Sequence, residues 1–119
     1  MPHEIFREFT FDAAHRLAHL PPTHKCHRLH GHTYRLILHL AGPLDPKLAW
    51  VMDFADVKAV AAPIIAQLDH QYLNEIPGLE TPTAEVIAAW LWKRLKPTLP
   101  TLARITLHES ANAGCVYFE

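Results

Sequence analysis

The sharpest chemical feature of the sequence is the triplet His30-Gly31-His32. If this segment is a β-strand, both histidines point to the same face, because side chains two residues apart in a strand share a side. His15 ends an earlier strand-like segment and can supply a third imidazole if the two strands are antiparallel neighbours. Three histidines with an open fourth position are typical of a catalytic zinc site rather than a structural one. We therefore predict a zinc ion bound by His15, His30 and His32.

A cysteine lies close to this triplet. Cys26 stands in the run Lys25-Cys26-His27-Arg28, just before His30. Neighbouring cations and a metal ion favour the thiolate, which is the reactive form of cysteine. Cys26 is therefore a candidate base or nucleophile. An alternative is that Cys26 is itself a metal ligand, which would give a closed site of one cysteine and three histidines, and only geometry separates the two.

Two further positions carry side chains suited to proton transfer or binding. Asp69-His70 follows the first predicted helix, where a carboxylate can orient an imidazole and stabilise its charge. The alternative for this pair is a polar helix end without a chemical role. Glu109 shares a predicted strand face with Ile105 and Leu107, and a carboxylate on an apolar face needs a partner. That partner is either a structural arginine or a ligand with an amidine-like N–H edge.

Alternating hydrophobicity predicts the strands that position these residues. We expect strands over residues 5–14, 30–40, 104–109 and 115–118, the last two forming a hairpin. Two helices are predicted between the second and third strands, with Asp53 and Thr83 as N-caps. Pro63 lies inside the apolar pattern of the first helix, and we expect it to kink that helix or break it into two pieces.

The resulting order, β-β-α-α-β-β, predicts an α+β fold with a four-stranded antiparallel sheet and two helices on one face. Such a sheet has two open edges, and open edges are usually covered, charged or paired with another chain. We therefore expect the sheet to extend across the subunits of a homo-oligomer. The whole chain, residues 1–119, is predicted to be one domain.

The bulk composition argues against several classes of protein. The formal net charge is -1, which gives no bulk attraction to nucleic acid or to an anionic membrane. No apolar run approaches the roughly 20 residues of a membrane helix. Ten histidines in 119 residues are an enrichment, and their internal spacing favours a site over a terminal tag. Two cysteines make no disulfide framework and no signal peptide is apparent, so we expect a cytoplasmic protein.

Five motifs occur in order along the chain: Phe11-Asp12-Ala13-Ala14-His15, Cys26-x-x-x-His30-Gly31-His32, Leu68-Asp69-His70-x-x-Leu73-Asn74, Pro82-Thr83-x-Glu85 and Glu109. Together they resemble the 6-pyruvoyl-tetrahydropterin synthase family over essentially the whole chain. Within this family, the short spacing between Cys26 and His30 and the run 78–83 are most similar to the bacterial 6-carboxytetrahydropterin synthases of queuosine biosynthesis.

The resemblance implies a tunnelling fold, in which trimers close a barrel and two trimers stack into a hexamer. It implies that the histidine triad binds zinc and that Cys26 removes a proton from the substrate side chain. It further implies that His70, with Asp69, assists as a relay and that Glu109 binds or relays at the pterin ring. Active sites in the family lie between subunits, so Cys26 and Glu109 need not come from one chain.

The implied reaction converts 7,8-dihydroneopterin triphosphate to 6-carboxy-5,6,7,8-tetrahydropterin, acetaldehyde and triphosphate. Charge and proximity make Lys25, Arg28 and His24 candidates for contact with the triphosphate. One alternative is the sister activity, which forms 6-pyruvoyl-tetrahydropterin without carbon–carbon cleavage. A second is a non-catalytic zinc-binding module for nucleic acid, against which the low cysteine count and the net charge argue.

Overall fold

The computed structural model describes residues 2–119, and Met1, with which the predicted domain begins, lies outside the described residues. The elements are β1 (Glu4–His15), β2 (His30–Ala41), α1 (Phe54–Ile65), α2 (Ala84–Leu95), β3 (Leu102–Ser110) and β4 (Ala113–Tyr117). Two 3-10 turns, η1 (Lys25–His27) and η2 (Leu73–Glu75), lie in the connections. The predicted order β-β-α-α-β-β is confirmed.

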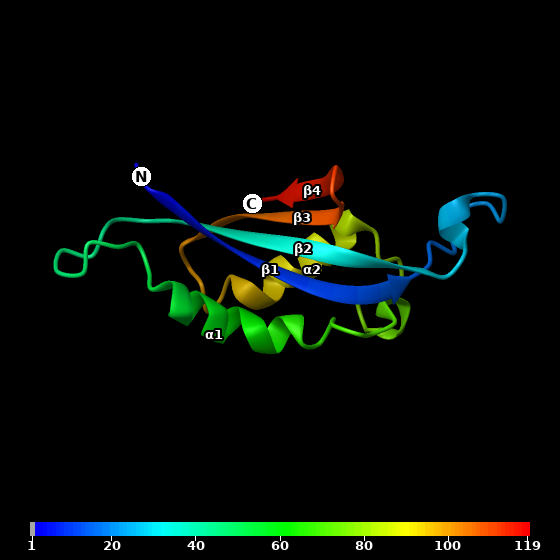
Figure 1. Cartoon of the computed structure of the whole chain (residues 1–119), viewed down its shortest axis with the longest axis horizontal. Coiled ribbons are helices and arrows are strands. Elements are labelled where there is room, and N and C mark those ends of the chain that lie inside the picture. The colour runs from blue at the N-terminus through cyan, green and yellow to red at the C-terminus, as the bar shows by residue number, and fades with distance from the viewer. Residues whose placement is uncertain (1) are drawn as a thin grey trace.

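The strands form one sheet in the order β1-β2-β3-β4, and every neighbouring pair is antiparallel. Both helices pack against the same face of this sheet (Figure 1). The register places Phe11 opposite Tyr34, and their rings stack with centroids 4.9 Å apart. The sheet does not close on itself within residues 2–119, because β1 and β4 stand at its two edges. The α+β fold class is therefore confirmed.

The core lies between the sheet and the helices. β2 buries Tyr34 and the three leucines that follow it at every second position, as strand alternation requires. From the other side, α2 buries Ile87, Leu91 and Leu95, which recur at the spacing of one helix face. Both patterns place the apolar face of each element inward.

Helix α1 runs through Pro63 as one continuous helix, so the expected break does not occur. Pro63 lies near the C-terminal end and is exposed, so the missing N–H removes one bond where few turns remain to be disrupted. The predicted caps are present. Asp53 Oδ1 accepts from the Ala55 N–H at 2.9 Å, and Thr83 Oγ1 accepts from the Val86 N–H at 3.2 Å.

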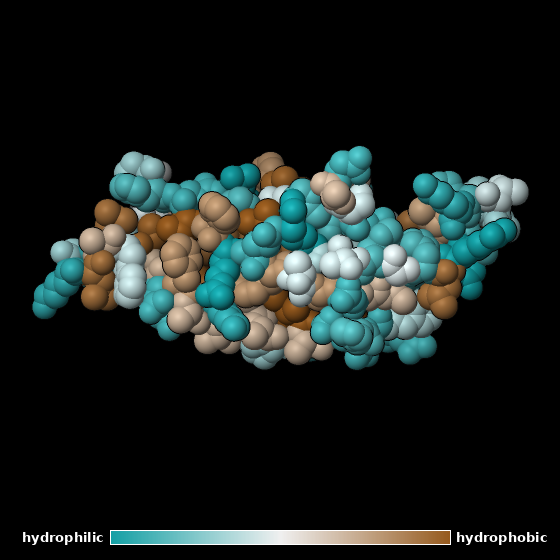
Figure 2. All heavy atoms as spheres, in the orientation of Figure 1, coloured by the Kyte–Doolittle hydropathy of each residue, from teal (hydrophilic) through white to brown (hydrophobic). Residues whose placement is uncertain are grey.

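The molecule is elongated, with extents of 57 × 24 × 22 Å. The connection 16–29 projects from one end of the sheet and the connection 42–53 from the other (Figure 1). Hydrophilic side chains dominate the segment 16–29 at the right of Figure 2, and hydrophobic side chains gather toward the opposite end. Among residues 2–119, neither helix has the length and hydrophobicity needed to cross a bilayer.

The chain that leaves α1 returns along the outer edge of β1. The His70 N–H donates to the Asp12 carbonyl at 2.6 Å, and the Ala14 N–H donates to the Gln71 carbonyl at 3.0 Å. A parallel bridge joins Ala14 and Tyr72. This connection therefore covers the C-terminal part of the β1 edge and leaves the N-terminal part free for another partner.

Candidate metal centre and active site

The register of β1 and β2 brings the three predicted histidines together. His15 lies directly opposite His30, and His32 lies opposite Ala13, two residue pairs further along the ladder. The ring centroids of the triad lie 4.6, 4.9 and 5.0 Å apart, and one nitrogen from each ring lies within 4.8 Å of the others. The triad therefore converges at one end of the sheet, as the sequence spacing predicts.

Backbone carbonyls fix the tautomers of two of these rings. His15 donates through Nδ1 to the Pro82 carbonyl at 2.8 Å, and His30 donates through Nδ1 to the Arg28 carbonyl at 2.7 Å. Each Nε2 is then left with a lone pair, and the two Nε2 atoms face each other at 3.0 Å. Two lone pairs at that distance repel unless a proton or a cation lies between them. Metal-binding histidines usually donate their other ring N–H to a carbonyl or carboxylate in this way, which fixes the orientation of the ring.

The third imidazole also lacks a protein partner. Nε2 of His32 is buried and has no hydrogen bond among the described residues. Oε1 of Glu109 lies 3.2 Å from this nitrogen, which is close enough for electrostatic attraction, but the contact lacks hydrogen-bonding geometry. A buried, unpartnered nitrogen beside two opposed lone pairs is what a metal ion with nitrogen ligands requires. These residues fit a zinc ion.

Burial favours the metal-binding form of the triad. Desolvation is the largest cause that lowers the pKa of His15 and of His32, and the Glu109 carboxylate opposes it in both. Both rings are therefore held in the neutral form that donates a lone pair to a metal. Beneath them, the Tyr34 ring packs 5.6 Å from His32 and 6.1 Å from His15, and burial raises the pKa of its hydroxyl.

Cys26 and Glu109 share a single pocket with two members of the triad, His30 and His32. This pocket, of about 440 Å³, is lined by Lys25, Cys26, His30, His32, Glu109 and Ser110. Cys26 lies in η1, where Nδ1 of His24 accepts from its N–H at 3.1 Å. Two groups of described residues have ligand atoms within 4.8 Å of one another, the three histidines and the set Asp12, Asp69 and His70, and neither contains the Cys26 thiol. This geometry argues against the closed cysteine-and-histidine site within one chain.

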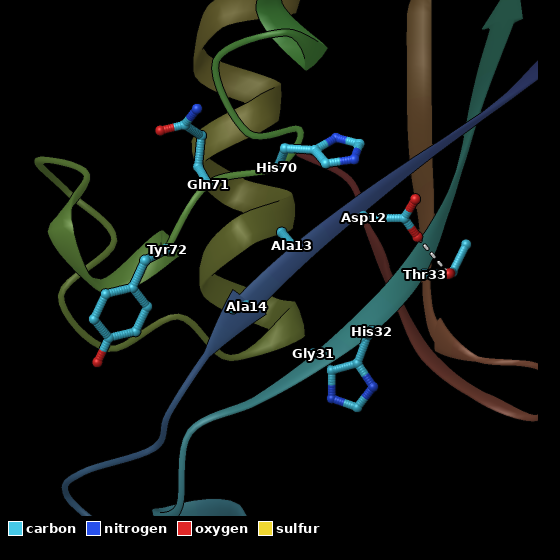
Figure 3. A pocket seen from close by; sticks show the side chains of 9 residues that line it. All are labelled: Asp12, Ala13, Ala14, Gly31, His32, Thr33, His70, Gln71 and Tyr72. Atoms are coloured by element: carbon cyan, nitrogen blue, oxygen red, sulfur yellow. Dashed lines mark hydrogen bonds between the residues drawn. The ribbon is translucent and has the colours of Figure 1, made fainter.

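Asp69 and His70 lie on a different surface. They stand where the returning connection meets β1, and His70 lines a pocket of about 540 Å³ together with residues of β1 and β2, among them Asp12, Thr33 and His32. Figure 3 shows His70 beside β1, the hydrogen bond from Thr33 to Asp12 across the strands, and the His32 ring at β2, which also lines this pocket. The structure therefore does not bring Asp69 and His70 into the Cys26 pocket of the same chain.

Contacts with neighbouring groups nevertheless hold the Asp69–His70 pair in a defined geometry. Oδ1 of Asp69 accepts from the Asp12 N–H at 3.0 Å and lies 3.0 Å from Nδ1 of His70. The Asp12 N–H, followed by His70, lowers the pKa of the Asp69 carboxyl. His70 has a positive φ of 59°, which is unusual for a residue other than glycine. The sequence motif predicts the pair, but nothing in it indicated that Asp12 and Thr33 also face this pocket.

The fold and the site together define a tunnelling-fold protein with a histidine triad suited to a metal ion. The chain belongs to the 6-pyruvoyl tetrahydropterin synthase family, whose model matches residues 4–119.

The similar proteins carry several names within this family. A 6-carboxy-5,6,7,8-tetrahydropterin synthase from Synechocystis is 39% identical over 120 residues, covering 96% of this chain and 92% of the relative. A dihydroneopterin monophosphate aldolase from Pyrococcus furiosus is 35% identical, with 96% of each chain covered. The solved 6-pyruvoyl tetrahydropterin synthase of Caenorhabditis elegans has a TM-score of 0.90 at 26% identity, covering 98% of this chain and 95% of its own.

Proposed function

We propose that this protein is a zinc-dependent lyase. It converts 7,8-dihydroneopterin triphosphate and water to 6-carboxy-5,6,7,8-tetrahydropterin, acetaldehyde and triphosphate. The observation that carries the proposal is one pocket that Cys26 and Glu109 share with His30 and His32, two members of the convergent histidine triad. The name and 39% identity of the Synechocystis relative support this activity over its sisters.

His15, His30 and His32 would hold the zinc ion, and two of the rings are already directed by backbone carbonyls. When bound, zinc supplies Lewis acidity toward the hydroxyls of the substrate side chain, whose neighbouring protons become easier to remove. The neutral state of the buried imidazoles keeps their lone pairs available, because desolvation disfavours the protonated form.

Cys26 and Glu109 divide the remaining work in the pocket. Cys26 as thiolate accepts a proton from the side-chain carbon, which lets the double bond move and triphosphate leave. Glu109 accepts hydrogen bonds from the 2-amino group and the N3–H of the pterin ring, which fixes the ring relative to the sulfur. Lys25 lines the same pocket and, with Arg28 and His24 nearby in the chain, supplies positive charge for the triphosphate.

We propose that Asp69 and His70 act on the substrate held by a neighbouring subunit. Their separation from the Cys26 pocket within one chain is the supporting observation. His70 returns a proton to the substrate, and Asp69 stabilises the charge that His70 then carries. Because the site is complete only when two chains meet, activity depends on assembly.

We propose a trimer, or a dimer of trimers, built by pairing of free sheet edges. The outer face of the sheet carries ion pairs, Glu8 with Arg35 at 2.7 Å and Glu4 with Arg104 at 2.9 Å. A face of this polarity suits the water-filled interior of a closed barrel better than a dry interface. In the cell, we place the enzyme in the cytoplasm and its product in queuosine or another deazapurine pathway.

The experiment is turnover of dihydroneopterin triphosphate by zinc-loaded protein, with the pterin product identified by mass spectrometry. We expect 6-carboxytetrahydropterin. A pyruvoyl pterin would indicate the sister activity, and preferential turnover of the monophosphate would indicate an activity like that named for the Pyrococcus relative. Nucleic-acid binding at physiological salt without turnover would favour the binding module.

The role of Cys26 has its own test. We expect Cys26→Ala to keep stoichiometric zinc and to lose about 100- to 10,000-fold in kcat, the range that positioned proton transfer contributes. Cys115→Ala is the matched control, since Cys115 packs partly buried against the core away from this pocket. Loss of zinc together with activity in Cys26→Ala would instead make Cys26 a ligand.

A further inference from the structure

Asn74 makes contacts that the proposed mechanism does not use. Its side-chain amide binds both backbone groups of Arg16, a residue 58 positions earlier. Oδ1 of Asn74 accepts from the Arg16 N–H at 2.9 Å, and Nδ2 of Asn74 donates to the Arg16 carbonyl at 2.8 Å. The Asn74 amide thus makes, with the N–H and the carbonyl of Arg16, the two hydrogen bonds that the backbone of a neighbouring strand would otherwise make.

This pairing completes the series of bonds along the β1 edge. The returning connection binds Asp12 and Ala14 through its own backbone, and Asn74 takes over at Arg16, just after β1 ends. The edge is therefore held at every second residue up to the point where the projecting segment 16–29 begins. Asn74 fixes the direction in which that segment leaves the sheet.

Arg16 carries this constraint to the turn that bears Cys26. Nε of Arg16 donates to the His27 carbonyl at 3.2 Å, and its guanidinium nitrogen lies 3.3 Å from Nε2 of the His27 ring. Next to it, the Leu17 N–H donates to the Cys26 carbonyl at 2.8 Å. Both ends of the projecting segment are thus tied together at the residues adjoining Cys26.

We propose that Asn74 is a positioning residue for Cys26, acting through Arg16. Asn74 holds the Arg16 backbone, and Arg16 with Leu17 holds η1, so that the thiol faces the pocket with Glu109 and the triad. The expected effect on turnover rests on the proposed function, whereas the hydrogen-bonded connection from Asn74 through Arg16 to η1 does not.

Most of the support of the triad lies outside this network. The Pro82 carbonyl fixes His15, and the β1–β2 ladder that carries all three histidines uses neither Asn74 nor the side chain of Arg16. The network comes near the triad at His27, because the next residue holds the His30 ring through its carbonyl. We therefore expect loss of the Asn74 amide to release the thiol while the ladder keeps the histidines in place. A variant that merely weakened the fold would disturb both.

The test compares Asn74→Ala, Arg16→Ala and the double variant, all zinc-loaded, by the rate at which iodoacetamide alkylates Cys26. Either single variant removes the contacts at one end of the same link, so we expect Cys26 to react about 3- to 10-fold faster in each of them. The double variant should show little further increase, because both changes break the same link. Zinc content should stay stoichiometric, and kcat should fall about 10- to 100-fold with KM nearly unchanged.

Two controls keep the result interpretable. Cys115, read by mass spectrometry in the same samples, reports any general loosening, and Asn112→Ala removes an asparagine from the β3–β4 turn. Asn74→Asp keeps the acceptor for the Arg16 N–H and should react at an intermediate rate, and it replaces Asn74→Ala if that variant does not fold.

An unchanged Cys26 alkylation rate in folded Arg16→Ala would overturn the proposal, as would loss of zinc in Asn74→Ala. Faster alkylation in a protein that does not turn over the pterin would support the link between Asn74 and Cys26 while removing the proposed lyase function.

Discussion

The three imidazoles of the triad differ in what holds them. His15 and His30 each donate to a backbone carbonyl, whereas His32 has only its burial and the nearby Glu109 carboxylate. A metal ion would therefore matter most for His32, because its buried Nε2 has no hydrogen-bond partner among the described residues.

We predict that His32→Ala abolishes stoichiometric zinc binding. Removing a ligand should weaken zinc affinity by more than the roughly 10- to 100-fold that outer-shell changes cost. Metal content after dialysis against a weak chelator measures this. His19→Ala is the control, since His19 lies outside the convergent group and should keep full zinc content. Full zinc in His32→Ala would refute the three-histidine site.

His39, which lies outside the triad, should make the stability of the folded protein sensitive to acid. Desolvation, then the Arg104 guanidinium, lowers the pKa of His39, with Glu4 opposing both. The unfolded chain therefore binds more protons than the folded one just below the ordinary histidine pKa of about 6.5. Stability should rise with pH through that window and fall as the pH drops below it.

Urea unfolding at about pH 7.5 and about pH 5.5 measures this effect. We expect the metal-free protein to lose stability at the lower pH and His39→Gln to lose less. His15 and His32 have pKa values shifted in the same direction, so a smaller loss remains in the variant. An equal loss in both proteins would exclude His39 as a contributor.

At the scale of single residues, the sequence predicts which side chains share a strand face, but it does not predict the hydrogen bonds that hold them in place. Strand parity placed the triad correctly, because side-chain alternation is a local property. The Asn74–Arg16 contact joins residues far apart in the chain, and it depends on a connection whose path along β1 leaves no hydrophobic pattern. A polar contact of this kind emerges only when the chain is folded.

Among the elements, the hairpin of β3 and β4 depends on a close approach at Gly114. A Cβ there would lie 2.2 Å from the Leu107 carbonyl oxygen and 2.8 Å from the His108 Cα, both backbone atoms. Neither can move without shifting a strand. The close pairing of β3 and β4 at this point therefore depends on the absence of a side chain at position 114.

We predict that Gly114→Ala destabilises the protein by about 1–3 kcal/mol, the usual cost of overpacking. The change in the free energy of urea unfolding measures this. Gly31→Ala is the matched control, since its Cβ would meet only the Ala13 carbonyl at an ordinary 3.4 Å. Equal stability of the two variants would show that β4 relaxes freely.

The elements themselves were largely predictable. Alternation gave the strands within a few residues, and both N-caps were correct because capping is decided by one side chain. Of the kink or break expected at Pro63, the break does not occur, since the exposed proline lies close to the end of the helix. The pairing of residues 69–72 with β1 was not predicted, because it uses backbone groups that every sequence possesses.

At the scale of the whole molecule, the N-terminal part of the β1 edge is the feature that suggests pairing with another chain. Asp12 and Ala14 direct backbone groups toward the returning connection, so by alternation Thr10 directs its N–H outward as well. No described residue pairs with that part of the edge. Pairing with a second copy would satisfy it.

We predict that Thr10→Pro lowers the mass of the assembly toward that of one chain. Proline removes an outward N–H and leaves the β1–β2 ladder intact, because edge strands tolerate it there. Thr10→Ala removes the side chain alone and should leave the assembly intact. Light scattering after gel filtration distinguishes the two, and an unchanged oligomer in Thr10→Pro would place the interface elsewhere.

The most direct test of the proposed function is the molar ratio of acetaldehyde to triphosphate released from dihydroneopterin triphosphate by the zinc-loaded protein. The proposed lyase releases the two in equal amounts, because carbon–carbon cleavage follows each elimination. Triphosphate without acetaldehyde would contradict the lyase while keeping the fold and the metal site, and release of neither product would contradict the proposed function as a whole.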